Sequence, residues 1–206
     1  MKNLLIDICG AISIVLALWA AIPYIISILN GRTKPHQLTW LVFSIMNGVV
    51  LVSQYLKGGR ASVLISLIWF ITSSADFVLS LKYGVRSTSR WDGLLFGLSI
   101  LTIAAWVITS NPSVAIWLTV VIDIFATTMM ILKIKARPGT EAANPWIIAT
   151  VAYVFTVLSV TNRPLGILYV RPIYGLLSDI AVVAAILVFG GTIKKTKKDS
   201  ISPTMV

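Results

Sequence analysis

Long apolar runs, separated by short segments rich in Gly, Pro, Asn and basic residues, make up most of this chain. A helix needs about 20 predominantly apolar residues to cross the hydrocarbon core of a bilayer. Runs of this kind lie at residues 4–29, 38–56, 61–83, 91–109, 113–132, 145–160 and 166–189. The segments between them are too short to hold a soluble domain. The pattern therefore predicts an all-α integral membrane protein with seven transmembrane helices.

The amino-acid composition excludes further classes of protein. Hydrophobic residues occupy 57% of the 206 positions and charged residues only 12%, whereas soluble domains carry about 45–50% apolar and about 25% charged residues. An ordinary soluble enzyme or a nucleic-acid-binding domain is therefore excluded. A single cysteine, Cys9, rules out an intramolecular disulfide, and a single histidine, His36, leaves no basis for a metal site. Because the sequence also lacks the motifs of zinc proteases, serine hydrolases and phosphate-binding loops, we expect neither an enzyme nor a cofactor.

The basic residues are unevenly distributed between the two sides of the predicted bundle. With the N-terminus outside, the cytoplasmic side receives twelve of the 17 Lys and Arg residues and the other side five. The twelve are Arg32, Lys34, Lys82, Arg86, Arg90, Lys133, Lys135, Arg137, Lys194, Lys195, Lys197 and Lys198, and the five are Lys2, Lys57, Arg60, Arg163 and Arg171. Cytoplasmic loops carry the excess of Lys and Arg. We therefore predict that the N-terminus lies outside the membrane and that residues 192–206 form a basic cytoplasmic tail.

Several landmarks recur along the chain. The second and sixth runs share the pattern Trp-x3-(Ser/Thr)-x2-(Asn/Tyr), which begins at Trp40 and again at Trp146, an offset of 106. The third and seventh runs carry Asp76 and Asp179, an offset of 103. A basic, proline-containing hinge precedes each of the two tryptophans. Coincidence is an alternative explanation, because Trp at membrane interfaces and Pro in loops are common. The preserved order of the landmarks favours an internal repeat.

The repeat divides the chain into 1–84, a first three-helix unit, 85–111, a linker helix, and 112–191, a second three-helix unit. A direct fusion of two three-span units would invert the second one. The additional linker helix restores its orientation, so the sequence predicts parallel repeats about an axis along the membrane normal.

Seven helices in a 3+1+3 arrangement on a short chain resemble the SWEET and PQ-loop (MtN3-like) transporter superfamily, and in particular its uncharacterised bacterial members. The segment 21–34, AIPYIISILNGRTK, resembles the first-helix signature of the family, in which a proline within the helix precedes a basic Thr-Lys hinge. Tyr24 stands where the family has glutamine, and the second copy lacks the proline. The resemblance implies a bacterial inner-membrane protein with a central substrate site to which the third and seventh helices contribute polar side chains.

A polar stripe on the third helix supplies the strongest site candidate. Its members, at spacings of 4, 3, 4, 3 and 4, are Ser62, Ser66, Trp69, Ser73, Asp76 and Ser80, and this spacing places them on one helical face. An ionised acid in hydrocarbon costs about 2.5–3.5 kcal/mol or more. We therefore expect Asp76 to line a cavity, while close helix packing stays an alternative explanation for the serines.

The resemblance places Asp76 opposite Asp179 across the repeat axis, where two nearby acids would share one proton. Two carboxyls suit a cationic or amino-bearing solute, or a proton, better than a sugar. The predicted substrate-binding set is Asp76, Asp179, Asn47, Tyr153, Ser73, Trp69, Asp123 and Thr127, and the predicted hinges are Pro23 and Pro172. Asp123 has two alternative roles: it lines the cavity, or it pairs with Arg171. Trp40 and Trp146 are assigned to interface anchoring in preference to ligand contact.

These features favour a transporter that moves a small polar solute by alternating access, with proton coupling through the intramembrane acids as an option. Two alternatives stay open: a cargo or sorting receptor on the same scaffold, and a membrane scaffold that transports nothing. The expected partners are a small-molecule solute, coupling protons and the lipid bilayer, with no nucleic acid. A homo-oligomer is a further option.

The predicted topology can be tested by cysteine labelling in a variant that lacks Cys9. Cysteines introduced at Gly59 and Asn162 should react with an impermeant reagent outside intact cells, and those at Lys34, Ser87 and Thr196 should react only after lysis, because the basic segments stay in the cytoplasm. The opposite labelling pattern would reverse the orientation.

Overall fold

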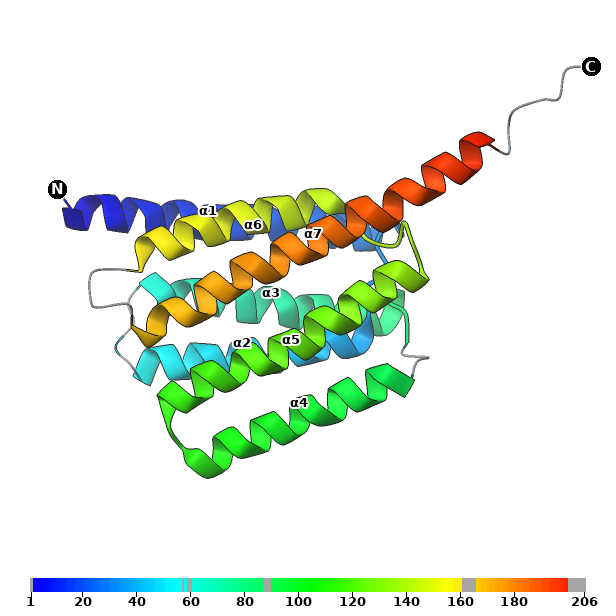
Figure 1. Cartoon of the computed structure of the whole chain (residues 1–206). Coiled ribbons are helices and arrows are strands. Elements are labelled where there is room, and N and C mark those ends of the chain that lie inside the picture. The colour runs from blue at the N-terminus through cyan, green and yellow to red at the C-terminus, as the bar shows by residue number, and fades with distance from the viewer. Residues whose placement is uncertain (1, 57, 59–60, 87–89, 161–165, 200–206) are drawn as a thin grey trace, which may run out of the picture.

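A computed structural model describes residues 2–56, 58, 61–86, 90–160 and 166–199, which contain seven helices and no β-strand. The helices are α1 (Lys2–Leu29), α2 (Gln37–Leu56), α3 (Ala61–Tyr83), α4 (Arg90–Thr109), α5 (Pro112–Ala136), α6 (Ala143–Ser159) and α7 (Ile167–Asp199). Successive helices run in opposite directions along the bundle (Figure 1). The predicted all-α class is confirmed for this part of the chain. Lys57, Gly59, Arg60, Ser87, Asn162 and Arg163 lie outside the described residues.

Six of the described helices, all except α6, are long and apolar enough to cross a membrane. Helix α6 has 17 residues, which span about 26 Å at a rise of about 1.5 Å per residue. Large apolar side chains are exposed on the outside of the bundle, including Trp19, Tyr55 and Ile108. Such a surface fits lipid rather than water, in agreement with the membrane class that the sequence predicts.

The C-terminal boundary differs from the sequence-based division, which ends the last helix at 189 and assigns 192–206 to a solvated tail. In the structure α7 continues to Asp199 and projects beyond the other helices (Figure 1). Once a helix has formed, each added residue contributes a backbone hydrogen bond, which favours its continuation. Residues 200–206 lie outside the described part of the chain.

Six helices form a closed ring in the order α1, α3, α2, α5, α7, α6, in which each helix packs against the next and α6 packs back against α1. Helix α4 lies outside this ring, against α5 and, over a smaller area, α2. The apolar core includes the fully or almost fully buried Ile28, Met46, Ile122, Met129 and Val182, from four of the ring helices. Each ring helix therefore has one face towards the centre of the bundle and another towards its surroundings.

The segments 30–36, 84–86 and 137–142 meet at one end of the bundle, which we call the hinge end. Val85 donates its backbone N–H to the Pro35 carbonyl at 2.8 Å, and Lys34 donates to the Thr140 carbonyl at 3.0 Å. His36 is buried here, with its Nε2 atom 3.4 Å from an Asp92 carboxyl oxygen. Burial lowers the pKa of His36, so this imidazole is neutral at neutral pH.

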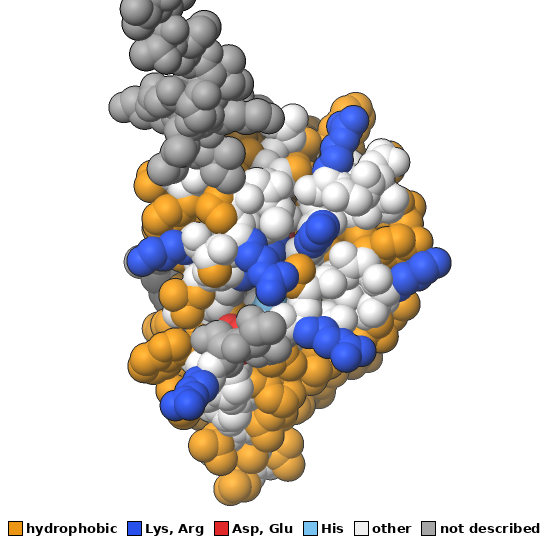
Figure 2. Space-filling view, turned by 90° about the vertical axis from the view of Figure 1, so that its right-hand side faces the viewer, with side chains coloured by type: hydrophobic (Ala, Val, Ile, Leu, Met, Phe, Trp, Pro, Cys, Tyr) orange, Lys and Arg blue, Asp and Glu red, His pale blue; other side chains and the backbone are white. Residues whose placement is uncertain are grey.

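Basic side chains surround the hinge end. Figure 2 shows this end of the molecule with separate Lys and Arg side chains around a polar centre and apolar side chains beyond them. The exposed basic residues of the three segments and the adjoining helix ends are Arg32, Lys34, Lys82, Arg86, Arg90, Lys135 and Arg137. The hinge end thus presents a positively charged rim above an apolar belt.

Gly84 allows the close contact between the end of α3 and the hinge before α2. A Cβ atom at this position would lie 2.4 Å from the carbonyl oxygens of both Pro35 and Ser80. We expect Gly84→Ala to destabilise the protein by about 1–3 kcal/mol, because the backbone must move to relieve this overpacking. Thermal unfolding in detergent measures the effect. Gly93→Ala is the matched control, since a Cβ atom there meets nothing within 4 Å and should leave stability unchanged or slightly higher. Equal melting temperatures for the two variants would contradict the packing argument.

Candidate functional site

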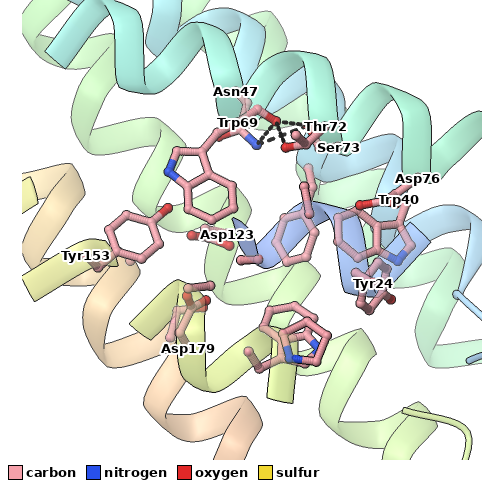
Figure 3. Close-up of a pocket in the computed structure, with 18 of the residues that line it drawn as sticks. Tyr24, Trp40, Asn47, Trp69, Thr72, Ser73, Asp76, Asp123, Tyr153 and Asp179 are labelled. Carbon is pink, nitrogen blue, oxygen red and sulfur yellow. Dashed lines mark hydrogen bonds between the residues drawn. The ribbon is translucent and has the colours of Figure 1, made fainter. Parts of the chain in front are cut away.

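A cavity lies in the centre of the six-helix ring (Figure 3). All six ring helices contribute lining residues, and none of the lining residues comes from α4. The empty space amounts to about 650 Å³, including its open mouth. The ring therefore encloses an empty space that is lined by residues of all six helices.

Most of the sequence-predicted site residues meet in this cavity. The residues of that set that line it are Asn47, Trp69, Ser73, Asp76, Asp123, Tyr153 and Asp179. Thr127 does not line it, but its hydroxyl donates to Asp123 Oδ1 at 3.3 Å and lies 2.7 Å from the Ser178 hydroxyl. Pro23 and Pro172 lie inside α1 and α7, which both continue through them as helix.

An aromatic wall forms the part of the cavity nearest the hinge end. Trp40 and Trp146, each the fourth residue of its helix, have ring centroids 6.2 Å apart, and Tyr24 lies 5.2 Å and 6.2 Å from them. Each tryptophan is only 8% exposed. The expectation that Trp40 and Trp146 anchor the protein at the membrane interface is therefore wrong: α2 and α6 direct them into the ring, where they contact each other.

Asp76 lies beside this wall, from α3 (Figure 3), and is 3% exposed. Its Oδ1 atom has no hydrogen-bond partner among the described residues. Glu141, by contrast, is fully engaged: the Tyr24 hydroxyl donates to its Oε2 at 3.2 Å, and Lys133 Nζ lies 2.5 Å from its Oε1. Sequence reasoning missed Tyr24 and Glu141. The available signal was that Glu141 is the only glutamate in the chain and directly follows the second basic hinge.

Trp69 and Tyr153 form a second aromatic contact, on the side of the cavity away from the hinge end. Their rings are stacked, with centroids 5.4 Å apart and planes within 6°. Tyr153 lies directly on α7 at Gly175, where a Cβ atom would be 2.5 Å from the ring. Both aromatic residues also line a smaller second cavity. The stacked pair therefore stands between the two cavities.

Arg171 and Asp123 form a buried ion pair in this region, with Nη1 2.8 Å from Oδ2. Both interpretations that the sequence left open for Asp123 thus hold, because it pairs with Arg171 and lines the cavity. The Arg171 Nη2 atom also lies 3.7 Å from the Met46 sulfur. The positive charge of Arg171 is therefore already neutralised within the protein.

Asp179 has different surroundings from Asp76. It is 7% exposed and its Oδ2 atom has no hydrogen-bond partner among the described residues. Its charged neighbours are Asp123 and Arg171, whereas the charged neighbour of Asp76 is Glu141. The sharing of one proton between Asp76 and Asp179 stays a prediction: the two carboxyls line one cavity, and their charged neighbours differ.

The side chain of Ser62 lies outside the described part of the structure, and the other serines of the predicted stripe have hydrogen-bond partners within the protein. Ser66 donates to Gln54 Oε1 at 3.0 Å, and Ser80 donates to the Phe77 carbonyl at 2.6 Å. Asn47 Nδ2 donates to Ser73 Oγ at 3.2 Å, which joins α2 to α3 at the cavity wall. Packing thus accounts for Ser66 and Ser80, and Ser73 orients Asn47.

No family model, characterised protein or solved structure matches this chain. Among the described residues, no group of three or more His, Cys, Asp or Glu side chains could hold a metal ion. The chemistry of the cavity must therefore be inferred from its own aromatic, amide and carboxyl groups.

The Arg171–Asp123 pair can be tested by comparing single and double replacements. Arg171→Met should destabilise the protein by about 3–5 kcal/mol, because it leaves a buried carboxyl without its partner. Combining it with Asp123→Leu should restore most of the lost stability, since the double variant contains neither charge. Thermal unfolding in detergent compares the variants. A single variant as stable as the original protein would show that the pair does not form.

Proposed function

We propose that this protein is a transporter of a small polar solute that works by alternating access around the central cavity. The observation that carries the proposal is the set of buried polar atoms of cavity-lining residues without a hydrogen-bond partner among the described residues, namely Asp76 Oδ1, Asp179 Oδ2, Arg171 Nη1 and the indole nitrogens of Trp40, Trp69 and Trp146. An unsatisfied buried group costs about 1–3 kcal/mol. A polar solute that bonds to these atoms would offset that cost, which is typical of a binding site.

The packing order supports the 3+1+3 arrangement of parallel repeats. If α1 is exchanged with α5, α2 with α6 and α3 with α7, the order of the helices around the ring stays the same. The proposed repeat mates Trp40 and Trp146 contact each other, and Asp76 and Asp179 line one cavity. Helix α4, the proposed linker, lies outside the ring. This is the arrangement implied by the resemblance to SWEET and PQ-loop transporters, with the substrate site between the units.

Two aromatic contacts provide the closures that alternating access requires. The Trp40–Trp146 contact lies near the hinge end, and the Trp69–Tyr153 stack separates the main cavity from the second one. In this proposal the two units rock so that one contact opens while the other stays closed. The exposed basic residues of the hinge end favour a cytoplasmic position for that end.

Coupling to protons is part of the proposal through the carboxyls that line the cavity. A carboxyl in low-dielectric surroundings binds or releases a proton according to the charges nearby. Because Asp76 and Asp179 have no direct cationic partner in the described structure, a bound solute would change their affinity for protons. Proton and solute binding would then be linked.

Uptake into proteoliposomes tests transport directly. The purified protein should accumulate at least one solute from a panel of labelled amines, amino acids and sugars, and an imposed pH gradient should change the rate. Ala149→Trp should abolish this uptake, because Ala149 lines the cavity and the larger side chain would fill it. Asp76→Asn and Asp179→Asn should remove the response to the pH gradient.

Ala104→Trp is the control, because Ala104 lies exposed on α4, away from the cavity. It should transport normally. Uptake that persists in Ala149→Trp would show that the solute does not pass through this cavity. No uptake of any panel member would favour a receptor or scaffold instead.

A further inference from the structure

The hinge-side part of the cavity combines aromatic surfaces with an unpaired carboxyl. Tyr24, Trp40 and Trp146 form the wall, and Asp76 lies next to them (Figure 3). The faces of aromatic rings attract cations within about 6 Å of the ring centroid. Asp76 Oδ1 has no hydrogen-bond partner among the described residues. Both kinds of group favour a positive charge at this place.

The charges that line the cavity point in the same direction. Asp76, Asp123 and Asp179 supply three acids, and Arg171 is the lining base. Arg171 already pairs with Asp123 at 2.8 Å. The negative charges of the Asp76 and Asp179 carboxylates would therefore have to be balanced by the solute that enters the cavity. Because Asp123 already balances the guanidinium charge, a solute carboxylate would meet no uncompensated positive charge, so zwitterionic amino acids fit poorly.

The available hydrogen-bonding groups distinguish between classes of cation. A primary ammonium carries three N–H donors that each need an acceptor, whereas the indole rings of Trp40 and Trp146 beside Asp76 offer no hydrogen-bond acceptor. A quaternary ammonium has no N–H donor and therefore needs no hydrogen-bond acceptor. The unpaired indole nitrogens of Trp40 and Trp146 are donors and would suit an oxygen atom elsewhere on the solute.

We propose that the solute is an organic cation of the quaternary ammonium class with a hydroxyl or similar oxygen acceptor, held by Asp76 as counter-ion against Tyr24, Trp40 and Trp146. The inference rests on the proposed transport function and specifies its substrate class. It is tested by equilibrium binding, which does not require transport to occur.

Labelled choline is the probe, with two unlabelled competitors that each change one property. The neutral carbon isostere 3,3-dimethylbutan-1-ol keeps the shape but lacks the charge, and glycine betaine keeps the quaternary ammonium but adds a carboxylate. We expect choline to bind to the purified full-length protein and both competitors to displace it at least about tenfold more weakly than unlabelled choline. No choline binding, or equal displacement by the neutral isostere or by betaine, would overturn the proposal.

Two variants test the residues. Asp76→Asn should weaken choline binding at least about tenfold, and Trp146→Leu about threefold or more, because each removes one of the cation-binding groups. The matched controls are Asp7→Asn and Trp117→Leu, which make the same changes at exposed positions and should bind choline normally. Unchanged affinity in both cavity variants would overturn the assignment. Transport of a neutral solute without choline binding would refute this inference alone, whereas choline binding without transport would refute only the transporter.

Discussion

The structure depends on one constraint: lipid offers no hydrogen-bond partner to a polar side chain, so every intramembrane polar group must face protein or an enclosed space. The six-helix ring meets this constraint by turning the polar faces of its helices towards one centre. Asp76, Asp123, Asp179 and Arg171 are all almost completely buried there, while large apolar residues such as Trp19 and Ile108 are exposed on the outside. The cavity, its charges and its aromatic walls all follow from this inside-out distribution.

In and beside the cavity, the buried polar groups fall into two kinds. Some satisfy one another, as in the Arg171–Asp123 pair and the contact of Lys133 with Glu141. Others, such as Asp76 Oδ1 and Asp179 Oδ2, have no partner among the described residues. Satisfied groups hold helices together, and unsatisfied ones lower stability unless something binds to them. This contrast separates the structural acids from those we propose to contact solute.

The aromatic residues combine packing and recognition. Trp40, Trp146 and Tyr24 join α2, α6 and α1 near the hinge end, and Trp69 with Tyr153 joins α3 to α6. An aromatic pair contributes only about 0.5–1.5 kcal/mol beyond the burial of its surface, so such contacts can separate and re-form at a modest energetic cost. Contacts of this kind suit positions that must alternately open and close, and Gly175 gives Tyr153 the room to lie flat against α7.

The sequence alone predicted the helical class, six of the membrane-length helices and seven of the cavity residues, because hydrophobic run length and helical spacing are local properties of the chain. It did not predict that Trp40 and Trp146 face each other, that Glu141 and Tyr24 are hydrogen-bonded, or that Asp76 and Asp179 have different charged neighbours. Helical periodicity shows which residues share a face, but not how a helix is rotated against its neighbours or at what depth two faces meet. Those relations arise only when the side chains of the whole ring pack together.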